Sequence, residues 1–323
     1  MHTGHGDDIY AYEDIRLNFS SNIYNHFDHT GLYAHLTKSL ASVGHYPEPP
    51  ERRISPMMAN YLGVNENEVL VTSGATEAIY LVAQAFAGAA STIAEPTFAE
   101  YGDAVRLHAK MHSSNDKLMW ICNPNNPTGK AIERSLMIEK ISSNKDTTFV
   151  IDASYASFTR VPLLNAAEAI ALGNTIMIHS LTKDFSVPGL RLGCITAPAS
   201  IIQRLRALQM PWSINSLAVE AGVYLLAHAN DYHIPLDELL AESVRFANAL
   251  DTYIDVEPSD THIRLCRLHR GTAAALKERL AREHGILIRD ASNFSGLTPA
   301  HFRIAVQTPA ENNCLIEAIK CCI

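Results

Sequence analysis

The sequence predicts an α/β protein. It should have a large domain built on a mostly parallel central sheet with helices on both faces (α/β/α), and a smaller α+β domain. Short apolar runs alternate with helix-like segments from residue 51 to residue 183, which is the pattern of parallel strands joined by crossover helices. The last third of the chain mixes short strands with helices, which is typical of a separate, smaller unit.

The composition fits a globular chain of this size. Its 323 residues are long enough for one large and one smaller domain. The net charge of −8 leaves no basic surplus for binding nucleic acid or anionic lipid. The six cysteines contain no C-x-x-C pair and lie mostly in apolar runs, as reduced cysteines do. With no apolar leader and no membrane-length apolar stretch, we expect a soluble, cytoplasmic protein.

We expect the chain to divide into an N-terminal arm (residues 1–45), a large domain (residues 46–211) and a small domain (residues 212–323) to which the arm contributes. The first 45 residues are rich in His, Asn and Tyr and look irregular, without an obvious core. Their six histidines have none of the regular spacings of zinc sites, so we expect no metal.

In the large domain, a helix-like segment at residues 51–62 ends at Gly63, a typical helix C-terminus. Further helices are expected at residues 77–86 and 99–108. Strands are expected at residues 68–71, 91–95, 117–122, 147–151, 175–178 and 192–197. In such a sheet the chemistry lies at the carboxyl ends of the strands.

The remaining elements belong to the second half of the chain. Helices are expected at residues 199–210, 216–229, 235–253 and 272–284, and a last helix closes the chain. Strand-like segments fall at residues 254–268, 286–288 and 302–306, with a turn at residues 292–299 before the last strand.

The stretch HSLTKDFSVPGLRLG (residues 179–193) directly follows one of the apolar strands. It places Lys183 between two hydroxyls, Ser180 and Thr182, and the guanidinium of Arg191. A lysine amine at a strand exit can form a Schiff base with the aldehyde of pyridoxal 5'-phosphate (PLP). The hydroxyls and the guanidinium would then hold the cofactor phosphate.

Two other interpretations compete for this stretch. Lys183 could be an ordinary surface lysine, which is the commonest place for this residue type. Residues 180–183 also match S-x-x-K, the signature of serine acyl-enzymes, but the S-D-N and K-T-G strings of those enzymes do not occur in the sequence. The other stretches therefore decide between a PLP site and no site.

Six blocks occur in a fixed order along the chain: SGATEA (73–78), EPTF (95–98), NPNNPTG (123–129), IDASY (151–155), SLTK (180–183) and GLRLG (189–193). Together they resemble the fold-type I PLP enzymes of the aspartate aminotransferase superfamily. The resemblance covers nearly the whole chain and implies that fold, PLP as cofactor and an enzymatic activity.

The resemblance also implies roles for single residues. Lys183 would carry PLP and then move protons, and Asp152 would pair with the protonated pyridine nitrogen, which keeps the ring an electron sink. Tyr155 and Asn126 would hydrogen-bond the ring oxygen, and Phe98 would stack on the ring.

A second group would bind the cofactor phosphate through backbone amides, hydroxyls and a guanidinium. Its members are Ser73, Gly74, Ala75, Ser180 and Arg191. Tyr46, in the segment HYPEPP, resembles a tyrosine that reaches the phosphate of the neighbouring subunit. The working unit would then be a homodimer with shared active sites.

Within the superfamily, the chain resembles threonine-phosphate decarboxylases of cobalamin synthesis and histidinol-phosphate aminotransferases. This likeness lies in GHGDDIY, NFSSNIYN and HYPEPP near the start, QMPWSIN in the middle, and ILIRDASNFSGLTPAHFRIAVQTPAEN near the end. It implies that Arg303 and Asn22 bind the substrate carboxylate, and that Arg289, helped by His5, binds the substrate's phosphate. A guanidinium fork matches both anions.

The implied reaction is decarboxylation of L-threonine O-3-phosphate to (R)-1-amino-2-propanol phosphate. The alternative is a PLP aminotransferase of histidinol-phosphate type, or one acting on another phosphorylated or acidic amino substrate. A non-catalytic PLP-fold module is a third hypothesis, since fold alone does not decide function.

Overall fold

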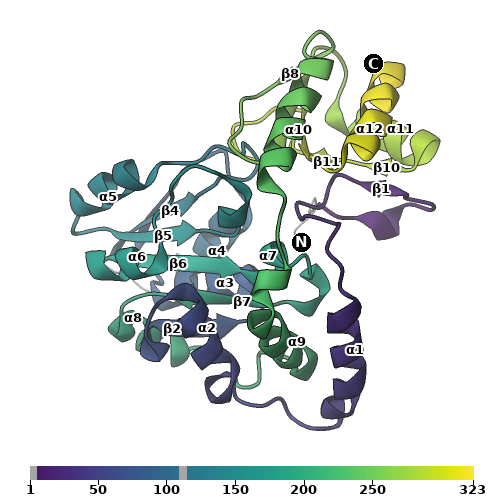
Figure 1. The fold of residues 1–323 in the computed structure, drawn as a ribbon. Helices are drawn as coiled ribbons and strands as arrows, with labels where there is room; N and C mark the ends of the chain where they lie inside the picture. Colours follow the sequence, from purple (N-terminus) through teal and green to yellow (C-terminus); the bar gives the residue numbers. More distant parts are fainter. Residues whose placement is uncertain (1–5, 109–114) are drawn as a thin grey trace.

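The computed structural model describes residues 6–108 and 115–323 and has a large sheet unit beside a smaller one (Figure 1). Within these ranges the large sheet has six strands in the order β2-β7-β6-β5-β4-β3. The strands β3 to β6 run parallel, whereas β7 is antiparallel to both of its neighbours. The predicted α/β class with a mostly parallel sheet is therefore confirmed. The strands are β2 (Val69–Thr72), β3 (Ala90–Ile93), β4 (Lys117–Cys122), β5 (Thr148–Asp152), β6 (Thr175–Ser180) and β7 (Gly193–Thr196).

Helices cover both faces of this sheet because its central strands are apolar on both sides. In β5, Val150 belongs to a core shared with α3, α4 and α8. Its neighbours Phe149 and Ile151 face the other way and pack with α5 and α6. On that same face α2 and α9 cover β2 and β7. The helices are α2 (Ile54–Leu62), α3 (Gly74–Ala85), α4 (Glu100–His108), α5 (Arg134–Ser142), α6 (Ala166–Leu172), α8 (Ala199–Arg206) and α9 (Ser216–Ala227).

The smaller unit is an antiparallel sheet in the order β11-β12-β9-β8, packed with three helices in the part of the chain that the structure describes. The predicted single strand at residues 254–268 is a hairpin, because the turn-forming residues Pro258, Ser259 and Asp260 separate β8 from β9. The elements are β8 (Ile254–Val256), β9 (Ile263–Leu268), β11 (Arg289–Asp290), β12 (His301–Ala305), α10 (Leu236–Leu250), α11 (Ala273–His284) and α12 (Pro309–Cys322).

The N-terminal segment contacts both units. Near its start, β1 (Leu17–Asn18) pairs in parallel with β10 (Ile286–Leu287) beside the small sheet. Further on, the helix α1 (Thr30–Ser39) packs against α9 (Figure 1). The expectation of an irregular segment was therefore wrong for α1. This helix buries only Leu32 fully, so its sequence carries little periodic signal and its stability comes from tertiary packing.

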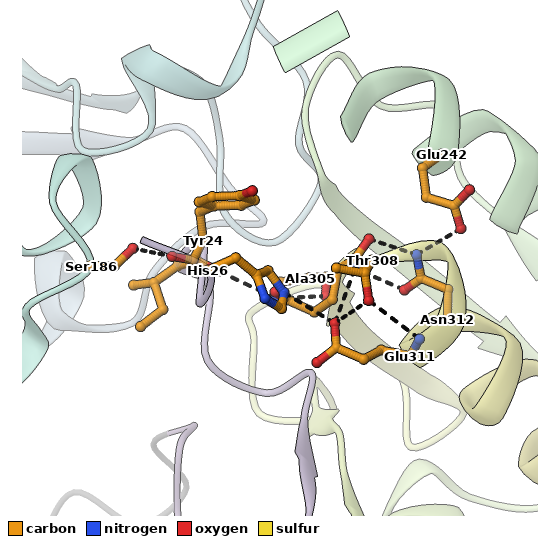
Figure 2. Close-up of polar contacts among 10 residues, drawn as sticks. Tyr24, His26, Ser186, Glu242, Ala305, Thr308, Glu311 and Asn312 are labelled. Atoms are coloured by element: carbon orange, nitrogen blue, oxygen red, sulfur yellow. Dashed lines mark hydrogen bonds and ion pairs between the residues drawn. The ribbon is translucent and has the colours of Figure 1, made fainter. Parts of the chain in front are cut away.

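Figure 2 shows how the chain between β1 and α1 is held on two sides. On one side, the hydroxyl of Ser186 donates to the backbone oxygen of Tyr24 at 2.5 Å. On the other, His26 Nε2 lies 3.0 Å from the Glu311 carboxylate. Glu311 belongs to the first turn of α12, where it also accepts the Thr308 hydroxyl at 2.6 Å. The segment is therefore anchored both to the loop that follows the short helix α7 (Leu181–Asp184) and to the small unit.

The boundaries expected at residues 45/46 and 211/212 stay predictions. The second one would place α9 in the small domain, and α9 packs against α1 and α2. Among the described residues, no helix combines the length and apolar character that a membrane crossing requires.

Candidate functional site

A cavity of about 250 Å³ lies where β4, β5 and β6 end, facing the strands β11 and β12 of the small sheet. The last residues of these three strands, Cys122, Asp152 and Ser180, all line it. This is the position that parallel sheets offer to ligands. Most of the predicted site residues line the same cavity: Asn22, Ala75, Phe98, Asn126, Asp152, Tyr155, Ser180, Lys183, Arg191, Arg289 and Arg303.

Lys183 lies on the short helix α7 (Leu181–Asp184), which directly continues β6. Its Nζ donates to Asn22 Oδ1 at 2.5 Å and lies 5.9 Å from the ring centre of Tyr155. Burial, followed by the nearby charge of Arg303, lowers the pKa of the Lys183 amine to about 7. A substantial share of this amine is therefore neutral at neutral pH, so it can act as a nucleophile.

Asp152 is a buried carboxylate at the end of β5, with 4% of its surface exposed. Its Oδ2 accepts the hydroxyl of Tyr101 at 2.7 Å, and its Oδ1 accepts the backbone N–H of Ser154 at 2.9 Å. Burial raises the pKa of Asp152, and both hydrogen bonds oppose that shift. A buried carboxylate held in this way can pair with a cationic ring nitrogen.

Two amide side chains hold neighbouring groups of the cavity: Asn22 links Lys183 to Tyr155, and Asn126 contacts Arg303. Asn22 Nδ2 donates to the hydroxyl of Tyr155, and burial raises the pKa of that hydroxyl, which keeps it neutral. Asn126 Oδ1 accepts from Arg303 Nη1 at 2.8 Å. The amide nitrogen of Asn126 therefore remains the group that could donate to a ligand oxygen.

Several groups that can donate to an anion lie together at the start of α3. Gly74 has a φ of +76°, a backbone conformation that strongly favours glycine, and a Cβ there would lie 2.7 Å from Nη2 of Arg191. The Oγ atoms of Ser180 and Thr182 lie 2.7 Å apart at the end of β6. N–H groups of a first helical turn, two hydroxyls and a guanidinium suit a phosphate. Ser73 and Gly74 adjoin the cavity without lining it.

Arg289 and Arg303 are direct partners across the β11–β12 pair, and both are buried. Arg303 also donates to the backbone oxygen of Ser20, and Arg289 Nη2 donates to Asn293 Oδ1 at 2.8 Å. Burial lowers the pKa of both guanidiniums, that of Arg303 to about 10. The oxygens that accept these hydrogen bonds are neutral, so two neighbouring positive charges face the cavity and can bind two anionic groups.

One predicted residue, Tyr46, lies apart from this cluster. Tyr46 is 78% exposed and stacks on Trp212, with ring centres 4.6 Å apart, outside the cavity. His5 lies outside the described residues.

Sequence reasoning missed several residues of the site. Tyr101 donates to Asp152, Ser20 and Asn293 hold the two arginines, and Asp7 lines the cavity. Tyr101 had a detectable signal, because it lies in the first turn of the helix that directly follows Phe98, and a buried tyrosine hydroxyl needs a partner. Ser20 contributes only its backbone oxygen, for which the sequence carries no signal.

The fold and the cavity, with a buried lysine amine, a buried carboxylate and a glycine-containing helix start, fit an enzyme class that uses a phosphate-bearing cofactor. The profile of the aminotransferase class I and II family matches residues 107–319, and the chain belongs to this family. The resemblance to fold-type I PLP enzymes is thereby confirmed, and PLP is the cofactor. The donors around Gly74, the buried Asp152 and the amine of Lys183 fit it.

The chain is similar to particular enzymes with two different activities. The crystal structure of L-threonine-O-3-phosphate decarboxylase from Porphyromonas gingivalis is similar with a TM-score of 0.90 and 38% identity, over 94% of this chain and 98% of that one. The threonine-phosphate decarboxylase of Salmonella typhimurium is 28% identical over 95% of this chain and 91% of the relative. A histidinol-phosphate aminotransferase of Caldanaerobacter subterraneus is also 28% identical, over 88% of this chain and 86% of the relative.

Proposed function

We propose that the chain is a PLP-dependent decarboxylase of L-threonine O-3-phosphate that forms (R)-1-amino-2-propanol phosphate. The observation that carries this proposal is the pair of buried guanidiniums of Arg289 and Arg303, directly opposed across two strands. Threonine phosphate has both a carboxylate and a phosphate, so it would use both arginines at once. Histidinol phosphate has no carboxylate and would use one. The similarity to two threonine-phosphate decarboxylases supports the same choice.

PLP, when bound, supplies an aldehyde for amine capture and a ring that accepts the electrons of a broken bond at Cα. Lys183 would attach the cofactor and later hold or return a proton through its Nζ. Asp152 would pair with the ring nitrogen, while the amide of Asn126 and the hydroxyl of Tyr155 would donate to the ring oxygen. Phe98 would cover one face of the ring.

The phosphate of PLP would lie at the start of α3. The backbone N–H groups of Gly74 and Ala75 would donate to it, as would Ser180 and Arg191, with Ser73 beside them. The close approach of Gly74 to the guanidinium of Arg191 supports this position, because both groups then face one anion.

Substrate orientation would decide which bond at Cα breaks. Arg303, with Asn22, would hold the carboxylate, and Arg289, with His5, would hold the phosphate. Fixing both anions fixes the rotation about the bond between Cα and nitrogen, and with it the bond that stands perpendicular to the ring. Decarboxylation requires the carboxylate to stand there.

The decisive assay supplies L-threonine O-3-phosphate to the PLP-loaded enzyme without any keto acid. We expect release of carbon dioxide and formation of one equivalent of the amino alcohol phosphate. The alternative, an aminotransferase of histidinol-phosphate type, is supported by the similarity to histidinol-phosphate aminotransferases. Amino exchange between histidinol phosphate and a keto acid, with no gas released from threonine phosphate, would replace the proposal with that alternative.

We further propose that the enzyme is a homodimer in which Tyr46 of each subunit reaches the cofactor phosphate of the other. Two features support this. Tyr46 and Trp212 are exposed although they are large aromatic residues, and Trp212 lines a groove formed with residues 47–51, Arg206 and residues 209–214. Exposed apolar patches of this kind are typical of interfaces.

Mixing two damaged variants tests the shared site. A Tyr46→Ala subunit keeps Lys183, and a Lys183→Ala subunit keeps Tyr46, so a hybrid dimer contains one intact site. We expect the mixture to exceed the summed activities of the separate variants. A monomeric mass by sedimentation, or no gain on mixing after subunit exchange, would contradict the shared site.

A further inference from the structure

Tyr101 is buried beside the proposed cofactor position, and none of the roles proposed above belongs to it. It lies on α4, with 1% of its surface exposed, and its hydroxyl donates to Asp152 Oδ2 at 2.7 Å. The other oxygen of Asp152 accepts the backbone N–H of Ser154 at 2.9 Å. Each carboxylate oxygen thus receives one donor of fixed position.

Packing of the Tyr101 ring against its neighbours fixes the direction in which its hydroxyl points. Its ring lies edge-on to Phe98, with centres 5.9 Å apart, and stacks on Trp120 at 5.8 Å. Trp120 is itself buried in β4. The ring therefore cannot turn away without breaking two aromatic contacts. Burial also raises the pKa of Tyr101 well above its usual value, so the hydroxyl remains a donor.

The hydrogen bond from Tyr101 affects the protonation state of Asp152. Burial of a carboxylate favours its neutral form, and a donor to the carboxylate favours the ionised form. The hydrogen bonds from Tyr101 and Ser154 both lower the pKa of Asp152 and so favour its ionised form. Ser154 acts through both its side chain and its backbone N–H in the turn after β5, whereas Tyr101 acts through a single hydroxyl that a substitution to phenylalanine removes without changing the ring.

We propose that Tyr101 is a positioning residue that holds Asp152 ionised and oriented toward the ring nitrogen of the cofactor. This inference rests on the proposed role of Asp152. Without the hydroxyl, Asp152 competes for the proton of the ring nitrogen, and the ring carries less positive charge. The cofactor then binds more weakly and accepts electrons less readily, whereas the substrate anions still meet Arg289 and Arg303.

The test is Tyr101→Phe, which removes the hydroxyl and keeps the ring between Phe98 and Trp120. The matched control is Tyr80→Phe, because Tyr80 on α3 also donates to a carboxylate, that of Glu100, at 2.8 Å. For Tyr101→Phe we expect the PLP dissociation constant to rise roughly tenfold, the effect of one hydrogen bond to a charged group. We expect kcat to fall by about the same factor with KM changed less than about twofold.

A spectroscopic readout separates this role from simple packing. The visible absorbance of bound PLP changes with pH, and its midpoint reports the basicity of the nitrogen that joins it to Lys183. Less positive charge on the ring makes that nitrogen more basic. We therefore expect the midpoint to rise in Tyr101→Phe and to stay at the wild-type value in Tyr80→Phe.

A double-mutant cycle completes the design. If Tyr101 acts through Asp152, adding Tyr101→Phe to Asp152→Asn should cause little further change in the absorbance midpoint or the PLP dissociation constant. Unchanged values in Tyr101→Phe beside shifted values in Asp152→Asn would overturn this inference alone. Unchanged values in Asp152→Asn would instead overturn the proposed role of Asp152. A Tyr101→Phe variant with lowered thermal stability but an unshifted midpoint would also overturn the inference.

Discussion

Replacing Lys183 with alanine is expected to abolish turnover, lowering kcat by roughly 10⁴-fold or more, because one side chain supplies both cofactor attachment and proton transfer. The matched control is Lys117→Ala at the exposed start of β4, where the lysine pairs with Asp146 on the surface. This control should keep wild-type kcat. Steady-state assays of both variants, loaded with PLP, give the comparison, and a Lys183→Ala enzyme within tenfold of wild type would contradict the proposed role.

The same lysine makes cofactor capture depend on pH. Because the pKa of Lys183 is lowered to about 7, its amine is protonated below that pH and neutral above it. Only the neutral amine attacks an aldehyde. The rate at which cofactor-free protein captures PLP should therefore rise as the pH increases through about 7 and then level off. An ordinary lysine, with a pKa of 10.5, would show a rate that keeps rising well beyond this range.

Replacing Arg289 with methionine is expected to raise KM for L-threonine O-3-phosphate roughly 100-fold, since losing one partner of a buried charge pair costs about 2–5 kcal/mol. The substitution should also remove competition by inorganic phosphate in the PLP-loaded enzyme. Arg303→Met should keep that competition. It should lower kcat as well as raise KM, because Arg303 also holds Asn126 and the backbone of Ser20.

Arg267→Met is the control for this pair. Arg267 lies on the neighbouring strand β9, is exposed and pairs with Asp255. Its replacement should therefore leave kcat and KM near the wild-type values. Inhibition by inorganic phosphate, measured for all three variants, assigns the anion sites. Phosphate inhibition that persists in Arg289→Met and disappears in Arg303→Met would reverse the proposed assignment.

The central part of the fold was predictable from the sequence because strand periodicity and strand ends are local signals. β4 begins and ends at the predicted residues, and Asp152 was expected at the end of β5. Strands that run parallel end at one edge, so Asp152 and Lys183 had to lie close together. The antiparallel direction of β7 was not predicted, because an apolar run carries no information on strand direction.

Contacts between residues far apart in the chain could not be predicted from local patterns. Asn22 contacts Lys183, and it belongs to the chain between β1 and α1, which is held by contacts to distant residues such as Ser186 and Glu311 (Figure 2). The family resemblance supplied Asn22 as a candidate, but not its hydrogen bond to the lysine. The hydrogen bond from Tyr101 to Asp152 likewise depends on the packing of α4 against the sheet.

Locating the attachment point of the cofactor tests the account most directly. Cofactor-free protein is incubated with PLP, reduced with borohydride, digested and analysed by mass spectrometry. The account predicts one pyridoxyl-phosphate group per chain on Lys183, with a yield that increases as the pH is raised through about 7. A label distributed over surface lysines, or no label at Lys183, would contradict the proposed site.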